Sequence, residues 1–257
     1  MNLRKKLGML LLAIAALLTV SACSSKPTEV IVSAAASLTD ALKEIEAVYE
    51  KQQHKVDLQF NFGASGALQQ QIEQGAQVDL FVSAAEKNMK ALVDKGMISE
   101  SDRTNLLGNE LVVVVPQNST AAIVSESDLQ LPELKKIAIG IPESVPAGSY
   151  AKEAFTAGQL WEPLQNKLVQ AKDVRQVLNY VETGNADAGI VYKTDALSSS
   201  KVKIALAVNP AHYSPIIYPI GIVSETKHKQ ETEAFYEYLQ SPEALDIFKK
   251  YGFSAPQ

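Results

Sequence analysis

Four short segments, several of them built from small, uncharged residues, each lie at the start of a predicted helix. A helix start leaves backbone N–H groups without partners, and the helix dipole there favours a negatively charged ligand. Ser37 and Ser65 add hydroxyl donors, and the small side chains allow a ligand to approach the backbone closely. These residue types predict an anion site built from neutral hydrogen-bond donors. The segments are residues 34–38, 62–67, 146–150 and 171–175.

Each segment also has a purely structural interpretation. Ser37 and Asp40 have the spacing of a capping box, and Asp173 is a good N-cap for a helix beginning at Val174. One such junction is more often structural than functional, but four of them on two facing lobes favour a binding site. Tyr192 is a fifth candidate, because a tyrosine at the end of a strand can point its hydroxyl into a cleft.

Motifs for catalysis or for a metal site are weak in this chain. The three histidines, His54, His212 and His228, have no ligand-like neighbour three or four residues away. Residues 63–66 lack the last glycine of a nucleophile elbow, and residues 198–201 match Ser-x-x-Lys only through a serine run. Neither nucleotide-binding glycine motif is present. An enzyme on the same fold is therefore the weaker alternative, and we expect no cofactor and no direct cation ligands.

Alternating strands and helices position the four segments. Apolar, β-branched runs predict strands at 30–32, 56–62, 79–82, 111–115, 137–139, 188–192, 202–208 and 218–224. Helical patterns follow at 37–49, 66–74, 89–95, 149–157 and 173–183, and two more helices end the chain. This alternation predicts an α/β fold in which each sheet is mainly parallel and flanked by helices.

The pattern divides the chain into two α/β units of similar size. We predict one lobe from residues 29–110 together with 219–257, and a second lobe from residues 111–218. Two chain crossings would then join the lobes and act as hinges for closure. A ligand site is expected in the cleft between them, near the carboxyl ends of the strands.

The N-terminus has the pattern of an export signal. Arg4, Lys5 and Lys6 precede a 14-residue apolar run at 7–20, which is too short for a comfortable membrane span. Val-Ser-Ala-Cys at 20–23 resembles a bacterial lipobox, which implies a signal peptide at 1–22, acylation of Cys23 and a tether at 23–28. The alternatives are a buried free thiol at Cys23, or a cleaved peptide with an incidental cysteine.

Composition excludes several classes of function. The chain has 24 basic and 29 acidic residues, and removal of 1–22 takes away three basic residues, so the mature net charge is 21 against 29, or −8. Such a chain lacks the basic surface that nucleic acids require. A single cysteine excludes a disulfide framework and a cysteine zinc cluster.

Several segments together resemble the molybdate-binding protein of bacterial ABC importers. The match runs in order from about residue 28 to residue 253, and its most specific part is Val-Pro-Ala-Gly-x-Tyr-Ala at 145–151. The resemblance implies a two-lobed periplasmic-binding-protein fold of type II. The matching segments are 34–39, 76–84, 142–154, 173–175, 189–192 and 247–253.

The resemblance also implies a ligand set and partners. In that family neutral donors hold the oxyanion, which places hydroxyl and backbone N–H donors at Ser37 and Ser65, backbone N–H donors at Ala147 and Val174, and a phenol donor at Tyr192. Ser65 is the only serine in its loop, where some relatives have a serine run. The implied protein is a monomeric, lipid-anchored receptor on the outer face of the membrane that delivers molybdate or tungstate to an ABC permease and its ATPase subunits. A sulfate or thiosulfate receptor is the nearest alternative.

A site made only of donors also carries specificity. A fully deprotonated tetrahedral anion needs only donors, whereas hydrogen phosphate brings a proton that requires an acceptor. Lys172, Arg175 and Lys193 lie near the site segments in the sequence, and we expect them to contribute at most an electric field rather than direct contacts.

Overall fold

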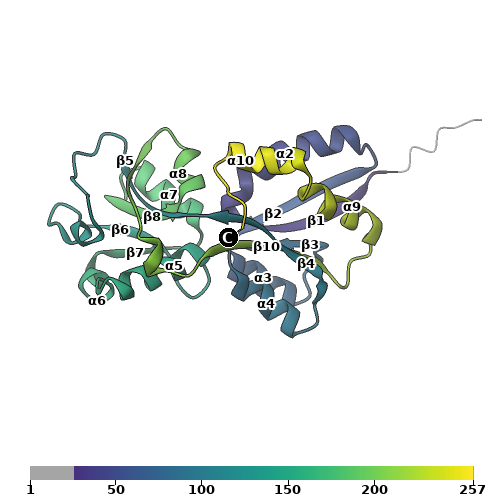
Figure 1. The fold of residues 1–257 in the computed structure, drawn as a ribbon, viewed down its shortest axis with the longest axis horizontal. Coiled ribbons are helices and arrows are strands. Elements are labelled where there is room, and N and C mark those ends of the chain that lie inside the picture. The colour runs from purple at the N-terminus through teal and green to yellow at the C-terminus, as the bar shows by residue number, and fades with distance from the viewer. Residues whose placement is uncertain (1–25, 257) are drawn as a thin grey trace, which may run out of the picture.

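Two five-stranded sheets, each flanked by helices, lie side by side in an elongated molecule (Figure 1). The computed structural model describes residues 26–256, so the predicted signal peptide and Cys23 lie outside the described residues. The first sheet has the strand order β2-β1-β3-β10-β4, and the second has the order β7-β6-β8-β5-β9. We call each sheet with its helices a lobe. The chain is therefore an α/β protein with two lobes.

The first lobe takes its elements from both ends of the chain. In Figure 1, α2, α9 and α10 cover one face of its sheet, and α3 and α4 cover the other. The elements are β1 (Thr28–Ala35), α2 (Thr39–Gln52), β2 (Val56–Gly63), α3 (Ser65–Glu73), β3 (Leu80–Val82), α4 (Glu86–Asp94), β4 (Ile98–Asn109), β10 (Ile216–Val223), α9 (Lys229–Leu239) and α10 (Pro242–Lys250), with a short 3-10 turn at Ala36–Leu38.

The second lobe is formed by the middle of the chain. Its elements are β5 (Leu111–Pro116), β6 (Ile137–Gly140), α5 (Pro146–Ala157), α6 (Trp161–Leu164), β7 (Leu168–Ala171), α7 (Val174–Glu182), β8 (Ala188–Tyr192), α8 (Lys193–Leu197) and β9 (Val202–Ala207). The chain crosses between the sheets at residue 110 and again over 208–215. The exact lobe boundaries given above remain a prediction.

Both sheets are mixed, whereas the sequence predicts mainly parallel ones. Strand β1 is parallel to β2 and β3, and β6 is parallel to β7 and β8, but β10 and β5 are antiparallel to both of their neighbours. The reason is the path of the chain. Strands β10 and β5 each enter their sheet from the other lobe, so they run away from the cleft, while the parallel strands run towards it.

This topology places one edge of each sheet at the boundary between the lobes. The carboxyl ends of β1, β2 and β3 face that boundary from the first lobe, and the carboxyl ends of β6, β7 and β8 face it from the second. The loops that follow these strands lead into α2, α3, α4, α5, α7 and α8. The small-residue junctions predicted from the sequence are four of these loops.

Two elements differ from the sequence-based expectation. Strand β4 was not predicted, because Ile98–Asn109 is mostly polar. It lies at the edge of the sheet, where it pairs with β10 and, through Gly108, with Ser254, and several of its residues are exposed. Helix α5 begins at Pro146, three residues before the predicted start, with proline in the first turn. A Cβ at Gly148 would overlap the carbonyl oxygen of Gly140, so glycine there allows the first turn of α5 to lie against the end of β6.

No helix within residues 26–256 combines the length and the apolar character that a membrane span needs.

Candidate functional site

A small cavity of about 10 Å³ lies between the lobes, at the carboxyl ends of the parallel strands. All five residues predicted to bind the ligand line it, so the structure brings together every candidate from both lobes. That these residues hold a ligand remains a prediction. The lining residues are Ala35, Ala36, Ser37, Gly63, Ala64, Ser65, Ala84, Val145, Pro146, Ala147, Val174 and Tyr192.

Ser37 and Ser65 supply two hydroxyl groups from the first lobe. The Ser37 Oγ lies 2.9 Å from the hydroxyl of Tyr218, and helix α2 has no side-chain N-cap, so the capping interpretation of Ser37 is wrong. The Ser65 Oγ accepts a hydrogen bond of 2.9 Å from the backbone N–H of Ala84. Both serines are buried, and both therefore present their hydroxyls to an environment with little water.

Ala147 and Val174 contribute from the second lobe through the starts of two helices. Ala147 is the second residue of α5, and Val174 is the first residue of α7. The backbone N–H groups of a first helical turn have no partner inside the helix. The Asp173 side chain caps α7 by accepting the N–H of Gln176 at 2.8 Å, as its position in the sequence predicts. This cap fixes the first turn of α7 beside the cavity.

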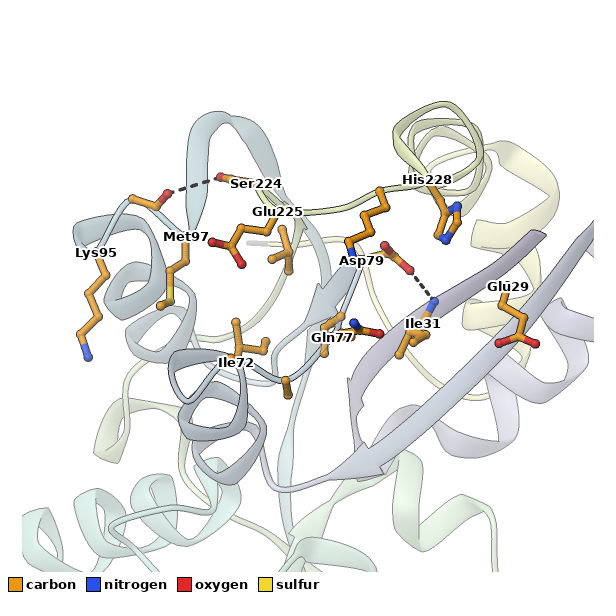
Figure 2. A pocket seen from close by; sticks show the side chains of 16 residues that line it. Glu29, Ile31, Ile72, Gln77, Asp79, Lys95, Met97, Ser224, Glu225 and His228 are labelled. Atoms are coloured by element: carbon orange, nitrogen blue, oxygen red, sulfur yellow. Dashed lines mark hydrogen bonds between the residues drawn. The ribbon is translucent and has the colours of Figure 1, made fainter.

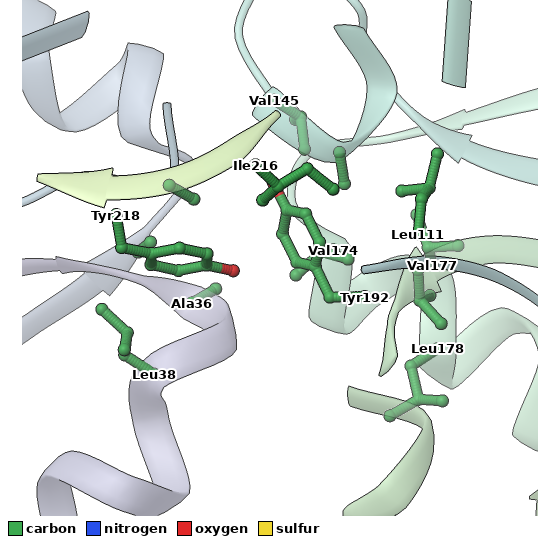
Figure 3. Packing of buried hydrophobic residues seen from close by; sticks show 14 of the residues in the cluster. Ala36, Leu38, Leu111, Val145, Val174, Val177, Leu178, Tyr192, Ile216 and Tyr218 are labelled. Atoms are coloured by element: carbon green, nitrogen blue, oxygen red, sulfur yellow. The ribbon is translucent and has the colours of Figure 1, made fainter. Parts of the chain in front are cut away.

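The Tyr192 hydroxyl is a buried polar atom that lacks a hydrogen-bond partner in the described part of the chain. Tyr192 is 1% exposed and is the last residue of strand β8, where its side chain lines the cavity. Figure 3 shows its ring opposite that of Tyr218, and the ring centroids are 5.7 Å apart. Burial raises the pKa of Tyr192 well above the ordinary value, so its hydroxyl keeps its proton and can donate it.

None of the cavity-lining side chains carries a charge. The three nearby cations instead lie elsewhere: Lys172 is exposed, Lys193 pairs with Glu110 at 3.3 Å, and Arg175 pairs with Asp40 at 2.7 Å. An anion in this cavity would therefore be held by hydroxyl and backbone N–H dipoles, which are stronger donors in a dry site than in water.

Three of the polar contacts between the lobes lie at helix starts around the cavity. The Gly66 N–H donates to the Ser144 carbonyl at 3.0 Å, and the Lys87 Nζ donates to the Ser149 Oγ at 2.9 Å. The pair between Arg175 on α7 and Asp40 on α2 is the third contact. Together they hold the helix starts of the two lobes against one another, which explains the small size of the cavity.

Asp195 is a buried carboxylate close to the site that the sequence analysis did not single out. Its Oδ1 lies 2.8 Å from the Arg175 Nε without the alignment of a hydrogen bond, and its Oδ2 accepts the Tyr192 N–H at 3.3 Å. Burial raises the pKa of Asp195 to about 6, although the charge of Arg175 opposes the shift. Tyr218 and Asn109 were also missed, and the only signal for Tyr218 was a tyrosine in an otherwise apolar strand.

A larger cavity of about 510 Å³ lies at the opposite end of the same strands (Figure 2). It is lined by the start of β1, the loop before β3 and the end of β10. Its buried carboxylate, Asp79, already accepts hydrogen bonds from the Ile31 N–H and the Thr226 hydroxyl. Nothing in this cavity is an unpaired buried donor or acceptor in the described residues, so the cleft is the better candidate site.

Two α/β lobes, two crossings and a donor-lined cavity between the lobes form the architecture of a solute-binding protein. Comparison with known sequences agrees with this class: the chain belongs to the family of bacterial extracellular solute-binding proteins, whose model matches residues 30–254. Proteins of this family serve transporters, and the family is not one of enzymes.

The relatives narrow the class further. The chain is 53% identical over 259 residues to the Bacillus subtilis protein named "Putative ABC transporter substrate-binding lipoprotein YvgL", covering 98% of this chain and 99% of that protein. It is 42% identical to the molybdate-binding protein ModA of Escherichia coli, over 88% and 89% of the two chains. The solved periplasmic molybdate-binding protein of Azotobacter vinelandii superposes with a TM-score of 0.80 at 26% identity, over 89% of this chain and all of that one.

Proposed function

We propose that this protein binds molybdate, and also tungstate, in the cavity between its lobes and delivers the anion to an ABC permease and its ATPase subunits. The observation that carries the proposal is the convergence of neutral donors from both lobes on one small, buried cavity. The relatives named for molybdate support the choice of anion. No cofactor is required, since the molybdenum is bound as its oxyanion.

The lining supports an anion without a proton. Ser37, Ser65 and Tyr192 offer hydroxyl hydrogens, and Ala147 and Val174 offer backbone N–H groups, whereas no carboxylate lines the cavity. A hydrogen phosphate ion would bury its own O–H against donors, which costs free energy. Sulfate satisfies the same chemistry, so a sulfate-type receptor is the second candidate, and only the measured order of affinities separates the two.

Titration calorimetry with molybdate, tungstate, sulfate and phosphate tests the proposal, together with thermal unfolding in each anion. A ligand that binds only the folded protein raises its stability by RT ln(1 + [L]/Kd). We expect large shifts with molybdate and tungstate, a much smaller shift with sulfate and the smallest with phosphate. A shift with phosphate equal to that with molybdate would contradict the donor-only site, and the tightest binding to sulfate would favour the second candidate.

We further propose that Cys23 is acylated after removal of residues 1–22, which would anchor the monomeric receptor to the outer face of the membrane. The motif at 20–23 and the lipoprotein name of the Bacillus subtilis relative support this step. Cell fractionation of wild type and Cys23→Ser, with mass spectrometry of the N-terminus, tests it. We expect the substitution to release the protein or leave it unprocessed, and an unmodified wild-type Cys23 would overturn the proposal.

A further inference from the structure

The amide of Asn109 has a fixed orientation at the crossing between the lobes. Its Oδ1 accepts the backbone N–H of Glu110 at 2.9 Å, and a backbone N–H can only donate. The Nδ2 must therefore point the other way, where it lies 3.1 Å from the Tyr218 hydroxyl and 3.0 Å from the Thr194 Oγ1. Asn109 is thus a donor to Tyr218.

The Tyr218 hydroxyl connects Asn109 to Ser37 at the binding cavity. Its side chain is fully buried, and its oxygen receives a hydrogen from Asn109. The phenol has one hydrogen of its own, and the Ser37 Oγ lies at hydrogen-bond distance, 2.9 Å, where it can accept that hydrogen. If Tyr218 donates to Ser37, then the hydroxyl hydrogen of Ser37 is free to point at a ligand.

The reverse direction leaves a buried hydrogen without a partner. If Ser37 donated to Tyr218, the phenol hydrogen would lose its acceptor, and Ser37 would present lone pairs rather than a hydrogen to an anion. An unpaired buried donor costs about 1–3 kcal/mol. With an anion against Ser37, only the direction from Asn109 through Tyr218 satisfies every hydrogen in the chain of bonds.

We propose that Asn109 and Tyr218 are positioning residues for oxyanion selection: the chain of hydrogen bonds from Asn109 through Tyr218 ends on the Ser37 oxygen, which leaves the single Ser37 hydrogen to be donated to the ligand. This inference rests on the proposed function, because it assigns the Ser37 hydrogen to the bound anion. Ser65 is arranged in the same way, since its oxygen receives the N–H of Ala84. Each hydroxyl thereby has its hydrogen free for the ligand and one acceptor position already used, which disfavours an oxyanion that retains a proton.

A double-mutant cycle tests this inference. Tyr218→Phe keeps the ring and removes the hydroxyl that joins Asn109 to Ser37. We expect molybdate affinity to fall about 3- to 10-fold, which is less than the loss of a whole hydrogen bond to a charged group. Asn109→Asp places an acceptor beside the Tyr218 hydroxyl and reverses the chain of bonds, so we expect a loss of about 10- to 100-fold. In the Tyr218→Phe background, Asn109→Asp can act only through its charge. The factor by which it lowers molybdate affinity should therefore be at least about threefold smaller there than in the wild-type background.

Selectivity gives a readout that loss of packing alone would not change. In Tyr218→Phe the Ser37 oxygen becomes free to accept a proton, so displacement titrations should show a lower ratio of molybdate affinity to phosphate affinity than in wild type. Tyr213→Phe is the matched control: it removes a hydroxyl that accepts the Leu111 N–H at 3.3 Å near the other crossing, outside the cavity. We expect it to preserve both the affinity and the ratio.

The outcomes separate this inference from the proposed function. If wild type binds none of the four oxyanions, the proposed function is wrong and the inference falls with it. If wild type binds molybdate but Asn109→Asp costs the same factor with and without the Tyr218 hydroxyl, the positioning role alone is overturned. Thermal unfolding of each variant in the absence of anion shows that it is folded at the temperature of the titration.

Discussion

At the scale of single residues, the Ser37 and Ser65 hydroxyls are the donors whose loss can be measured directly. Replacing either with alanine removes a hydrogen bond to a charged ligand, worth about 1.5–3 kcal/mol, so we expect molybdate affinity to fall about 10- to 150-fold in calorimetry. Binding should persist, because the backbone N–H groups remain. Each change also leaves a buried hydrogen without its acceptor, that of the Tyr218 hydroxyl or that of the Ala84 N–H, so a stability loss of about 1–3 kcal/mol should accompany it.

Ser33→Ala is the control for these two substitutions. The Ser33 hydroxyl is buried on strand β1 but has no hydrogen-bond partner in the described residues and does not line the cavity. Its removal should therefore leave affinity unchanged and cost little stability. Wild-type affinity in both Ser37→Ala and Ser65→Ala, with folding intact, would show that the cavity is not the anion site.

Asp195 is the residue for which the structure predicts a pH effect on stability. Its pKa is about 6 in the folded protein, against about 3.9 in an unfolded chain, so the folded state binds the proton more tightly. The stabilisation that this tighter proton binding gives the folded state is fully present below about pH 4 and is lost as the pH rises to 6. For a pKa difference of about two units it amounts to about 3 kcal/mol. Asp195→Asn removes the titration, so its unfolding free energy relative to wild type should rise by about that amount from pH 4 to pH 7.

Denaturant unfolding of both proteins at a series of pH values provides the measurement for Asp195. The two proteins are compared by how steeply their unfolding free energy changes with pH. Its absolute value in the asparagine variant is also shifted by loss of the contact with Arg175, by an amount that does not depend on this titration. Parallel curves over pH 4–7 would mean that the buried carboxyl does not have the raised pKa.

At the scale of elements, helix α3 of the first lobe touches the loop before α5 of the second through Gly66. A Cβ at Gly66 would lie 2.6 Å from the Ser144 carbonyl oxygen, so alanine there must push the lobes apart. We expect Gly66→Ala to weaken molybdate binding about 5- to 150-fold, from the 1–3 kcal/mol that overpacking costs. Its unfolding free energy should be unchanged or slightly higher, because alanine is the better helix former.

Gly75→Ala is the opposite case and serves as the control for Gly66→Ala. Gly75 has a φ of +87° with open space around the missing Cβ, so alanine costs about 1–2 kcal/mol of stability but meets no neighbour across the cleft. Calorimetry and thermal unfolding of the pair should therefore show opposite patterns. Unchanged affinity in Gly66→Ala would mean that the lobes need not approach this closely to bind the anion.

At the scale of the whole molecule, the net charge and the neutral site predict an unusual response to salt. The mature chain carries −8, which repels an anion at long range, and none of the lining side chains is cationic. Added salt screens that repulsion over a Debye length of about 8–10 Å, so affinity for molybdate should stay level or rise slightly with ionic strength. Calorimetry at increasing sodium chloride concentration measures this, and a steep fall in affinity would indicate a cationic site instead.

The sequence by itself determined the local parts of the site. Small residues at 34–38, 62–67 and 146–150, and the N-cap Asp173, specify strand-to-helix junctions because turn formation and capping depend only on near neighbours in the chain. The alternation of the elements likewise indicated two α/β units, and the order of the junctions indicated that they would meet. All five predicted ligand residues accordingly line one cavity.

Tertiary structure alone decided which groups complete that site. Asn109 and Tyr218 are 109 residues apart, and Tyr218 and Ser37 are 181 residues apart, so no local pattern could pair them. The antiparallel courses of β5 and β10 follow from the two crossings, and the polar strand β4 is held by its pairing with β10 rather than by its own pattern. The burial that raises the pKa of Asp195, and the contact that makes Gly66 necessary, likewise exist only when the two lobes pack together.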